Sequence, residues 1–301
     1  MFWISTAVVS TAIMGIVSIV DSHLISKRMP RLRSFLLLLG ILQLGFSIGT
    51  FAFNPLPKEI GSDTLVTAFT SGTLRSLGAL LMLKTMRFEE VSRVSSVVHT
   101  FPIFVAILAV PLLGEVLGYT EWLAIIMTVA GAILISINRD PHGRGTRLRK
   151  SFAMLAGSSL LMGMANIAAK YSLDYISFWN MYSVTALCLA TVFLLFSLRP
   201  WIVKELLELK QRGQVLSLLL INESIAIVGV ILSFWAIERG PVSIVSTIMS
   251  IRPGFVFIYS LSLSLFLPGA LEEQLSRGII VTKVISIGFI VGGVALLTLR
   301  I

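Results

Sequence analysis

Charged residues are scarce in this sequence. They make up 13% of its 301 residues, whereas hydrophobic residues make up 56% and the mean hydropathy is +0.93. Soluble domains carry about 25% charged residues, because a water-facing surface needs them. The composition excludes an ordinary soluble domain and indicates that the main partner of the chain is the lipid bilayer. We therefore attribute the net charge of +9 to membrane topology and expect no nucleic-acid partner.

Cysteine and histidine are also few, which limits the chemistry available. The one cysteine, Cys188, excludes an intramolecular disulfide and a thiolate cluster, and the three histidines show no metal-ligand spacing. No Gly-Lys dipeptide occurs, so the phosphate-binding GxxxxGK[ST] loop is absent. Residues 45–49 fit the GxSxG pattern, but they lie within an apolar run that no strand precedes. We expect no enzyme activity, no metal and no cofactor.

Apolar residues are present in blocks of about 20, each long enough to cross a hydrocarbon core about 30 Å thick as a helix. The first block has no basic residue before it and no cleavage site after it, so we expect no removed signal peptide. The fold class that follows is all-α and integral to the membrane. The pattern predicts ten transmembrane helices, at residues 2–20, 33–53, 64–83, 91–112, 119–138, 151–171, 177–198, 214–237, 242–266 and 279–299.

A basic linker, residues 139–150, divides the chain into two halves of five predicted helices, residues 1–138 and 151–301. An offset of 151 residues aligns the halves and superposes polar residues that recur every three or four positions, as on one face of a helix. The aligned pairs are Ser92 with Ser243, Ser95 with Ser246, Ser96 with Thr247, His99 with Ser250 and Pro102 with Pro253. Because each half has an odd number of spans, the second half enters the membrane upside down. This inverted repeat is typical of secondary transporters.

Several segments of the first half resemble the end of an EamA-type domain of the drug/metabolite transporter superfamily. They are residues 90–106, Leu-Leu-Gly-Glu at 112–115, Glu-Trp-Leu-Ala at 121–124, and residues 129–134. Residues 242–299 are similar but weaker, with Pro-Gly at 268–269 and Glu-Glu at 272–273 where Leu-Gly-Glu is expected. The resemblance implies two inverted five-helix EamA-like repeats and movement of small metabolites by alternating access, without ATP.

Basic residues are distributed unevenly over the connections. Most of the 24 Lys and Arg residues flank the odd-numbered connections, whereas only Lys58, Lys170, Arg239 and Arg300 lie on the other side. By the positive-inside rule the odd-numbered loops are cytoplasmic and both termini lie outside the plasma or inner membrane. Members of the resembled family usually have cytoplasmic termini, and we follow the charges. The residues at 201–210 predict a helix in the cytoplasmic interface.

Four ionisable residues fall at membrane depth, where each costs on the order of 2.5–3.5 kcal/mol unless a partner or a polar cavity receives it. They are Arg75, His99, Glu223 and Arg252. One hypothesis is that the two arginines bind an anionic group of the substrate, while Glu223 and His99 act as counter-charge and proton-responsive switch. The alternatives are that Glu223 pairs permanently with one arginine and that His99 is a neutral packing residue.

Further polar residues complete the predicted substrate site. Ser95 and Ser96 share a stripe with His99, Asn222 adjoins Glu223, and Asn166 shares a helix face with Lys170. For Lys170 we favour a side chain that reaches the membrane surface over one that faces the site. Asp21 and His23 end the first span, as a solvated boundary or as a gate.

Small residues occupy the last predicted span of each half. They are Ala130, Gly131, Gly288, Gly292 and Gly293, and the GxxxG spacing of Gly288 and Gly292 permits close helix contact. We expect the two spans to pack against each other within one chain. Dimerisation through this face is the alternative, so the protein is a monomer or a homodimer.

Together these features predict a secondary active transporter, an exporter or exchanger, of a small and possibly anionic metabolite, with proton coupling as an option. The alternative from another class is a flippase for a lipid or a lipid-linked carrier, in which the arginines would hold a head-group phosphate. Uptake of a soluble solute into liposomes would favour the first function, and movement of labelled lipid between leaflets the second.

Overall fold

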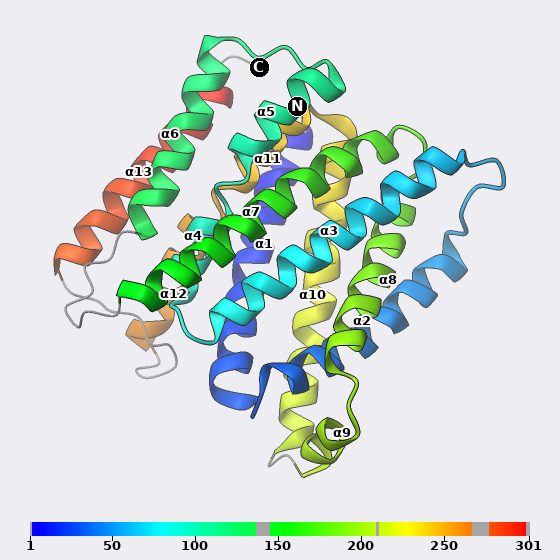
Figure 1. Cartoon of the computed structure of the whole chain (residues 1–301). Coiled ribbons are helices and arrows are strands. Elements are labelled where there is room, and N and C mark those ends of the chain that lie inside the picture. Colours follow the sequence, from blue (N-terminus) through cyan, green and yellow to red (C-terminus); the bar gives the residue numbers. More distant parts are fainter. Residues whose placement is uncertain (1, 137–144, 209–210, 267–276, 299–301) are drawn as a thin grey trace.

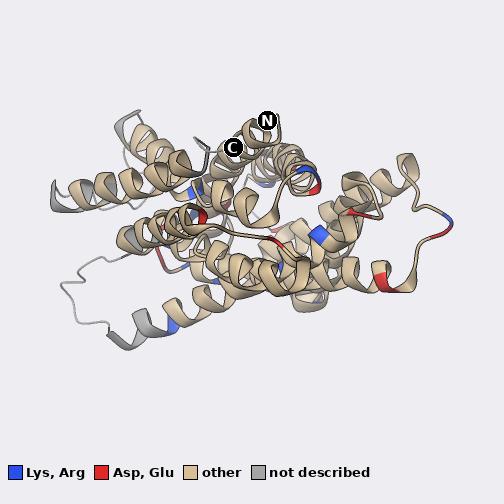
Figure 2. Cartoon of the chain, turned by 90° about the horizontal axis from the view of Figure 1, so that it is seen from above, with Lys and Arg blue, Asp and Glu red and all other residues tan. Residues whose placement is uncertain are grey.

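The computed structural model of the chain describes residues 2–136, 145–208, 211–266 and 277–298, which form helices joined by loops and contain no strand (Figure 1). Most of each helix is free of charged residues (Figure 2). The elements are α1 (Phe2–His23), a short π-helix (Leu24–Arg28), α2 (Leu32–Phe53), α3 (Ser62–Met86), α4 (Val91–Val98), α5 (Pro102–Leu113), α6 (Tyr119–Ser136), α7 (Gly145–Leu173), α8 (Phe178–Ser197), α9 (Pro200–Leu207), α10 (Arg212–Arg239), α11 (Val242–Met249), α12 (Arg252–Phe266) and α13 (Arg277–Thr298).

Eight segments of the described residues are long and apolar enough to cross a membrane. Six correspond to single helices, the first of them together with the short π-helix that follows it. The other two are the consecutive pairs α4–α5 and α11–α12. The remaining predicted spans correspond to α6 and α13, which are not among the eight. The prediction of an all-α membrane protein is confirmed, and the count of ten spans stays a prediction. Residues 145–150 of the predicted linker belong to α7, and residues 139–144 lie outside the described part.

Two predicted spans are interrupted near their middle. One helix ends at Val98 and the next begins at Pro102, and 151 residues later α11 ends at Met249 and α12 begins at Arg252. Proline has no backbone N–H to donate and clashes with the preceding turn, so Pro102 and Pro253 fit only the first turn of a new helix. The kink expected at each proline is therefore a break, and it exposes helix ends in the interior of the molecule.

Helices of the first half pair with helices of the second half. In Figure 1, α6 and α13 lie side by side at one edge, and α2 and α8 lie together away from them. In each of four pairs a glycine lets the backbones approach closely. These contacts are Gly229 of α10 on Met14 of α1, Gly78 of α3 on Ser158 of α7, Gly40 of α2 on Leu194 of α8, and Gly131 of α6 on Ser286 of α13.

The predicted packing of the last spans is confirmed, but through other glycines than the GxxxG pair. Gly131 and Gly293 make the close contacts between α6 and α13, whereas nothing lies within 4 Å of a Cβ added at Gly288. Gly292 has only a loose contact, at 3.7 Å from Met127. The GxxxG spacing is misleading here because close approach depends on which helix face meets the partner.

A helix also forms where an interfacial helix is expected. The side chain of Ile202 in α9 is buried, and Arg31 lies over the ring of Trp201, 4.7 Å from its centroid. Arg31 also pairs with Glu205 at 3.7 Å. These contacts attach α9 to the start of α2. Residues 209–210 of the predicted interfacial helix lie outside the described part.

Replacing Gly131 with alanine is expected to lower the free energy of unfolding by about 1–3 kcal/mol. The added Cβ would lie 2.6 Å from the carbonyl oxygen of Ser286. Gly288→Ala is the matched control on the partner helix, and we expect a change within about 0.5 kcal/mol there. Thermal unfolding of the purified protein in detergent measures both, and equal effects would contradict the packing of α6 on α13.

Candidate functional site

A cavity lies at the centre of the molecule, between α1, α2, α3, α7, α8 and α10 and the two helix breaks. Its volume is about 200 Å³, counted as the space that the centre of a water molecule can reach. Its walls are largely apolar, with a limited set of polar groups, as in typical small-molecule sites. The polar residues that line it are Ser10, Thr11, Asp21, Gln43, Arg75, His99, Asn166, Glu223, Ser233 and Arg252.

Five of the eight predicted site residues line this cavity: Arg75, His99, Asn166, Glu223 and Arg252. The four ionisable residues come from four different parts of the chain, so the fold brings them to one place. Asn222, Ser95 and Ser96 are buried but do not line it.

The serine stripe contacts its own helix more than the cavity. The Ser96 hydroxyl donates to the Ser92 carbonyl at 2.6 Å, and the Ser95 carbonyl oxygen lies 2.7 Å from Nδ1 of His99. Serine commonly bonds a carbonyl one turn back where water is absent. The contact with the Ser95 carbonyl orients the His99 ring.

Arg75 projects from α3 into the cavity and has only uncharged partners in the described residues. One guanidinium nitrogen donates to Oδ1 of Asn166 at 2.7 Å, and the group lies 5.0 Å from the ring centroid of Phe234. Its Nε is buried without a hydrogen-bond partner, and no carboxylate of the described residues lies within 4 Å. A buried donor without a partner is costly. Arg75 is therefore a buried cation without a carboxylate partner among the described residues.

The second arginine begins α12 at the other helix break. Arg252 donates to the Ser18 hydroxyl at 2.6 Å, and its Nε also lacks a partner. Its charge acts on Asp21 and on His99, so it is not isolated as Arg75 is. The sequence hypothesis gives the two arginines the same role, but their surroundings in the structure differ.

The permanent ion pair considered for Glu223 does not form. Glu223 accepts a hydrogen bond from Nε2 of Gln43 at 2.8 Å, and no ion pair within 4.0 Å joins it to an arginine among the described residues. The side chain is 4% exposed and lines the cavity. It is thus available to the cavity contents.

Two residues of the site are absent from the sequence prediction. Asp21, considered there as a boundary or gate, is 8% exposed, lines the cavity and accepts from Nδ2 of Asn222 at 2.8 Å. Gln43 lines it beside Glu223. A lone amide in an otherwise apolar span was the available signal for Gln43, since a polar side chain at membrane depth needs an internal partner. We call Asp21, Gln43 and Glu223 the acidic corner.

Comparison with known proteins identifies the family from the first part of the chain. Residues 1–137 match the EamA-like transporter family. This part of the chain is similar to an EamA-type transporter domain. The resemblance read from residues 90–134 is thereby confirmed, and the match does not extend to the second half.

A solved crystal structure has a similar fold to the whole chain. The two agree with a TM-score of 0.63 over 99% of this chain and 96% of the other, at 14% sequence identity. At that identity the likeness concerns the fold alone. A search of curated proteins found no match.

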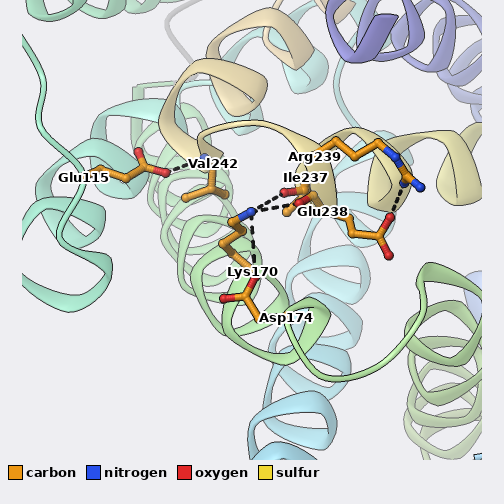
Figure 3. Close-up of polar contacts among 7 residues, drawn as sticks. All are labelled: Glu115, Lys170, Asp174, Ile237, Glu238, Arg239 and Val242. Carbon is orange, nitrogen blue, oxygen red and sulfur yellow. Dashed lines mark hydrogen bonds and ion pairs between the residues drawn. The ribbon is translucent and has the colours of Figure 1, made fainter.

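The EamA-type domain contacts the second half of the chain through Glu115, the last residue of its Leu-Leu-Gly-Glu segment (Figure 3). The helix before it ends at Leu113 and is followed by Gly114, whose φ of +68° is the left-handed conformation that favours glycine. The Glu115 carboxylate then accepts from the backbone N–H of Val242 at 2.5 Å, and from the N–H and hydroxyl of Ser243 at 3.2 and 2.5 Å. A carboxylate at the first turn of α11 also interacts favourably with the helix dipole.

Lys170 contacts the end of α10, on the other side of the connection between α10 and α11 (Figure 3). Its ammonium group donates to the carbonyl oxygens of Ile237 and Glu238 at 3.1 and 3.0 Å, in the last turn of α10, and lies 4.0 Å from Asp174. These contacts lie at the end of α10, and the favoured expectation of a side chain that reaches the membrane surface stays a prediction. The structure thus places opposite charges at the two helix ends that flank Gly240 and Pro241.

Glu115→Gln is expected to lower the stability by about 1–2 kcal/mol, because the amide keeps one acceptor oxygen and loses the charge that favours the helix N-terminus. The control is Glu205→Gln, which removes a carboxylate of the partly exposed pair with Arg31 and should change the stability by less than about 1 kcal/mol. Unfolding midpoints in detergent report both. A Glu115→Gln protein as stable as the control would contradict a capping role.

Proposed function

We propose that the protein is a secondary active transporter that moves a small metabolite with an anionic group through the central cavity. The observation that carries the proposal is Arg75, a cavity-lining cation with no carboxylate within 4 Å in the described residues and with a buried Nε that lacks a partner. The match of residues 1–137 to the EamA-like transporter family supports the assignment to transporters. The apolar walls and few polar groups suit a small solute.

We also propose ten spans in two inverted repeats. The support is the matched helix breaks, 151 residues apart, and the exchange of partners between the halves. The first span packs on α10 and the sixth on α3, as a two-fold relation between the halves requires. Rocking of one such repeat against the other is how alternating access works in transporters built this way.

Several contacts support a conformation in which the cavity is closed on the side of the even-numbered connections. There Trp3 packs on Gly240, the Tyr171 hydroxyl donates to Asp63 at 3.0 Å, and Asn180 donates to the Asn54 carbonyl at 2.7 Å. In the opposite direction the cavity reaches Asp21, Leu83 and Phe193, which lie close to the other ends of α1, α3 and α8. We infer that the cavity faces the odd-numbered connections, and hence the cytoplasm if the positive-inside rule holds.

The orientation can be tested with single cysteines. Cys188 is buried, so its background labelling should be low. In intact cells a membrane-impermeant maleimide is expected to label Lys58→Cys, in an even-numbered connection, and to label Gly213→Cys only after permeabilisation. The reverse pattern would place both termini in the cytoplasm, as is usual in the resembled family.

Substitution of Arg75 tests the transport proposal. A thermal-stabilisation screen with small carboxylates and phosphates is expected to find a ligand, and Arg75→Gln should weaken its binding about 10–100-fold, because a hydrogen bond to a charged group contributes about 1.5–3 kcal/mol. Uptake of that compound into proteoliposomes should fall accordingly. The control is Arg239→Gln, which removes a guanidinium that contacts Trp235 outside the cavity.

Two outcomes would contradict the proposal. Equal binding and uptake by the Arg75→Gln and Arg239→Gln proteins would show that Arg75 does not bind the anionic group in the cavity. Movement of a labelled phospholipid between leaflets, without uptake of any solute, would replace the transporter by the flippase.

A further inference from the structure

The acidic corner carries more negative charge than its surroundings compensate. Asp21 and Glu223 are 8% and 4% exposed, and the charge of Asp21 acts on Glu223. The cation whose charge acts on Asp21 is Arg252. No cation among the described residues acts on Glu223 in the same way. An uncompensated charge in a site of low polarity is costly, so the corner favours a proton or one further cation.

The hydrogen bonds of the corner point to the same need. Gln43 donates its amide N–H to Glu223, and Asn222 donates its amide N–H to Asp21, both at 2.8 Å. The amide oxygens, Oε1 of Gln43 and Oδ1 of Asn222, are then buried without a partner. These side chains are 8% and 2% exposed, so they are held in place beside the carboxylates. Gln43 lines the cavity, so a cation or a protonated amine in the cavity would supply the partner that its oxygen lacks.

We propose that the acidic corner binds a small monovalent cationic group, through the carboxylates of Asp21 and Glu223 and the amide oxygen of Gln43. Carboxylate and amide oxygens are hard ligands that suit a compact cation. The group is either an ammonium carried by the substrate or a free sodium ion that accompanies it. This inference deepens the proposed function and rests on it only in placing the corner in the transport cavity.

The position of Arg75 gives the inference a consequence for the substrate. No carboxylate acts on Arg75 among the described residues, whereas the acidic corner has a carboxylate in excess. The cavity is thus short of an anion at one place and of a cation at another. A substrate that carries both charges would satisfy both places at once. A substrate that carries only the anion would need the free cation as its companion.

The test uses the purified full-length protein and simple cations. Its thermal unfolding midpoint is measured in sodium chloride, in methylammonium chloride and in N-methylglucamine chloride at equal ionic strength and pH, without any anionic ligand. We expect sodium or methylammonium to raise the midpoint saturably by about 2–4 °C over the bulky reference cation. Glu223→Gln should abolish this shift. The matched control, Glu205→Gln, removes a carboxylate on α9 and should retain it.

Gln43→Leu serves as a second variant in case Glu223→Gln does not fold. It removes the unpartnered oxygen without changing a charge, and we expect the cation to bind at least several-fold more weakly. A shift with methylammonium alone supports an ammonium on the substrate, and a shift with sodium supports the free ion. No shift with either cation, or the same shift in Glu223→Gln and Gln43→Leu as in the wild type, overturns the proposal.

The two proposals can fail separately. The anion screen depends on Arg75 and the cation titration depends on Glu223, so an Arg75→Gln protein that keeps its cation shift leaves the acidic corner intact. A protein that binds an anion through Arg75 but shows no cation shift would retain the proposed function and lose this inference.

Discussion

A polar group at membrane depth that finds no partner within the protein costs several kcal/mol, because hydrocarbon offers no hydrogen bonds. The helices satisfy nearly all of their backbone groups locally, and side-chain hydroxyls such as that of Ser96 bond their own helix. Seven side chains of the described residues have a buried polar atom without a partner, and three of them, Arg75, Arg252 and Gln43, line the central cavity. Both arginines with such an atom therefore lie where a bound solute can reach them.

The pairing of the two halves depends on small residues rather than on charge. In a bilayer, apolar side chains gain little from association, so helices pack where glycine allows close van der Waals contact. Gly78, Gly131 and Gly229 each bring a helix of one half against a helix of the other. The charged contacts of Glu115 and Lys170 lie at helix ends, whereas those of Arg75 and Glu223 lie at the cavity.

The ionisable residues at membrane depth were predictable because hydropathy makes a single charge in an apolar block conspicuous. All four residues found in this way line the cavity: Arg75, His99, Glu223 and Arg252. Asp21 was harder to assign, since a carboxylate near the end of a span reads equally well as solvated. The contacts of Glu115 were beyond prediction, because its acceptors are backbone N–H groups of Val242 and Ser243, and every residue except proline has such a group.

The amino-acid sequence by itself indicated that the protein lies in a lipid bilayer, where most helices lie along the chain, and which family its first part resembles. These properties follow from local hydropathy and short motifs. Only the tertiary structure decided which charges meet. It left Arg75 without a described carboxylate within 4 Å, brought the charge of Arg252 to bear on Asp21, and placed the amide of Gln43 against Glu223. The reason is that the energy of a buried charge depends on distances between residues far apart in the chain, and no local pattern records those distances.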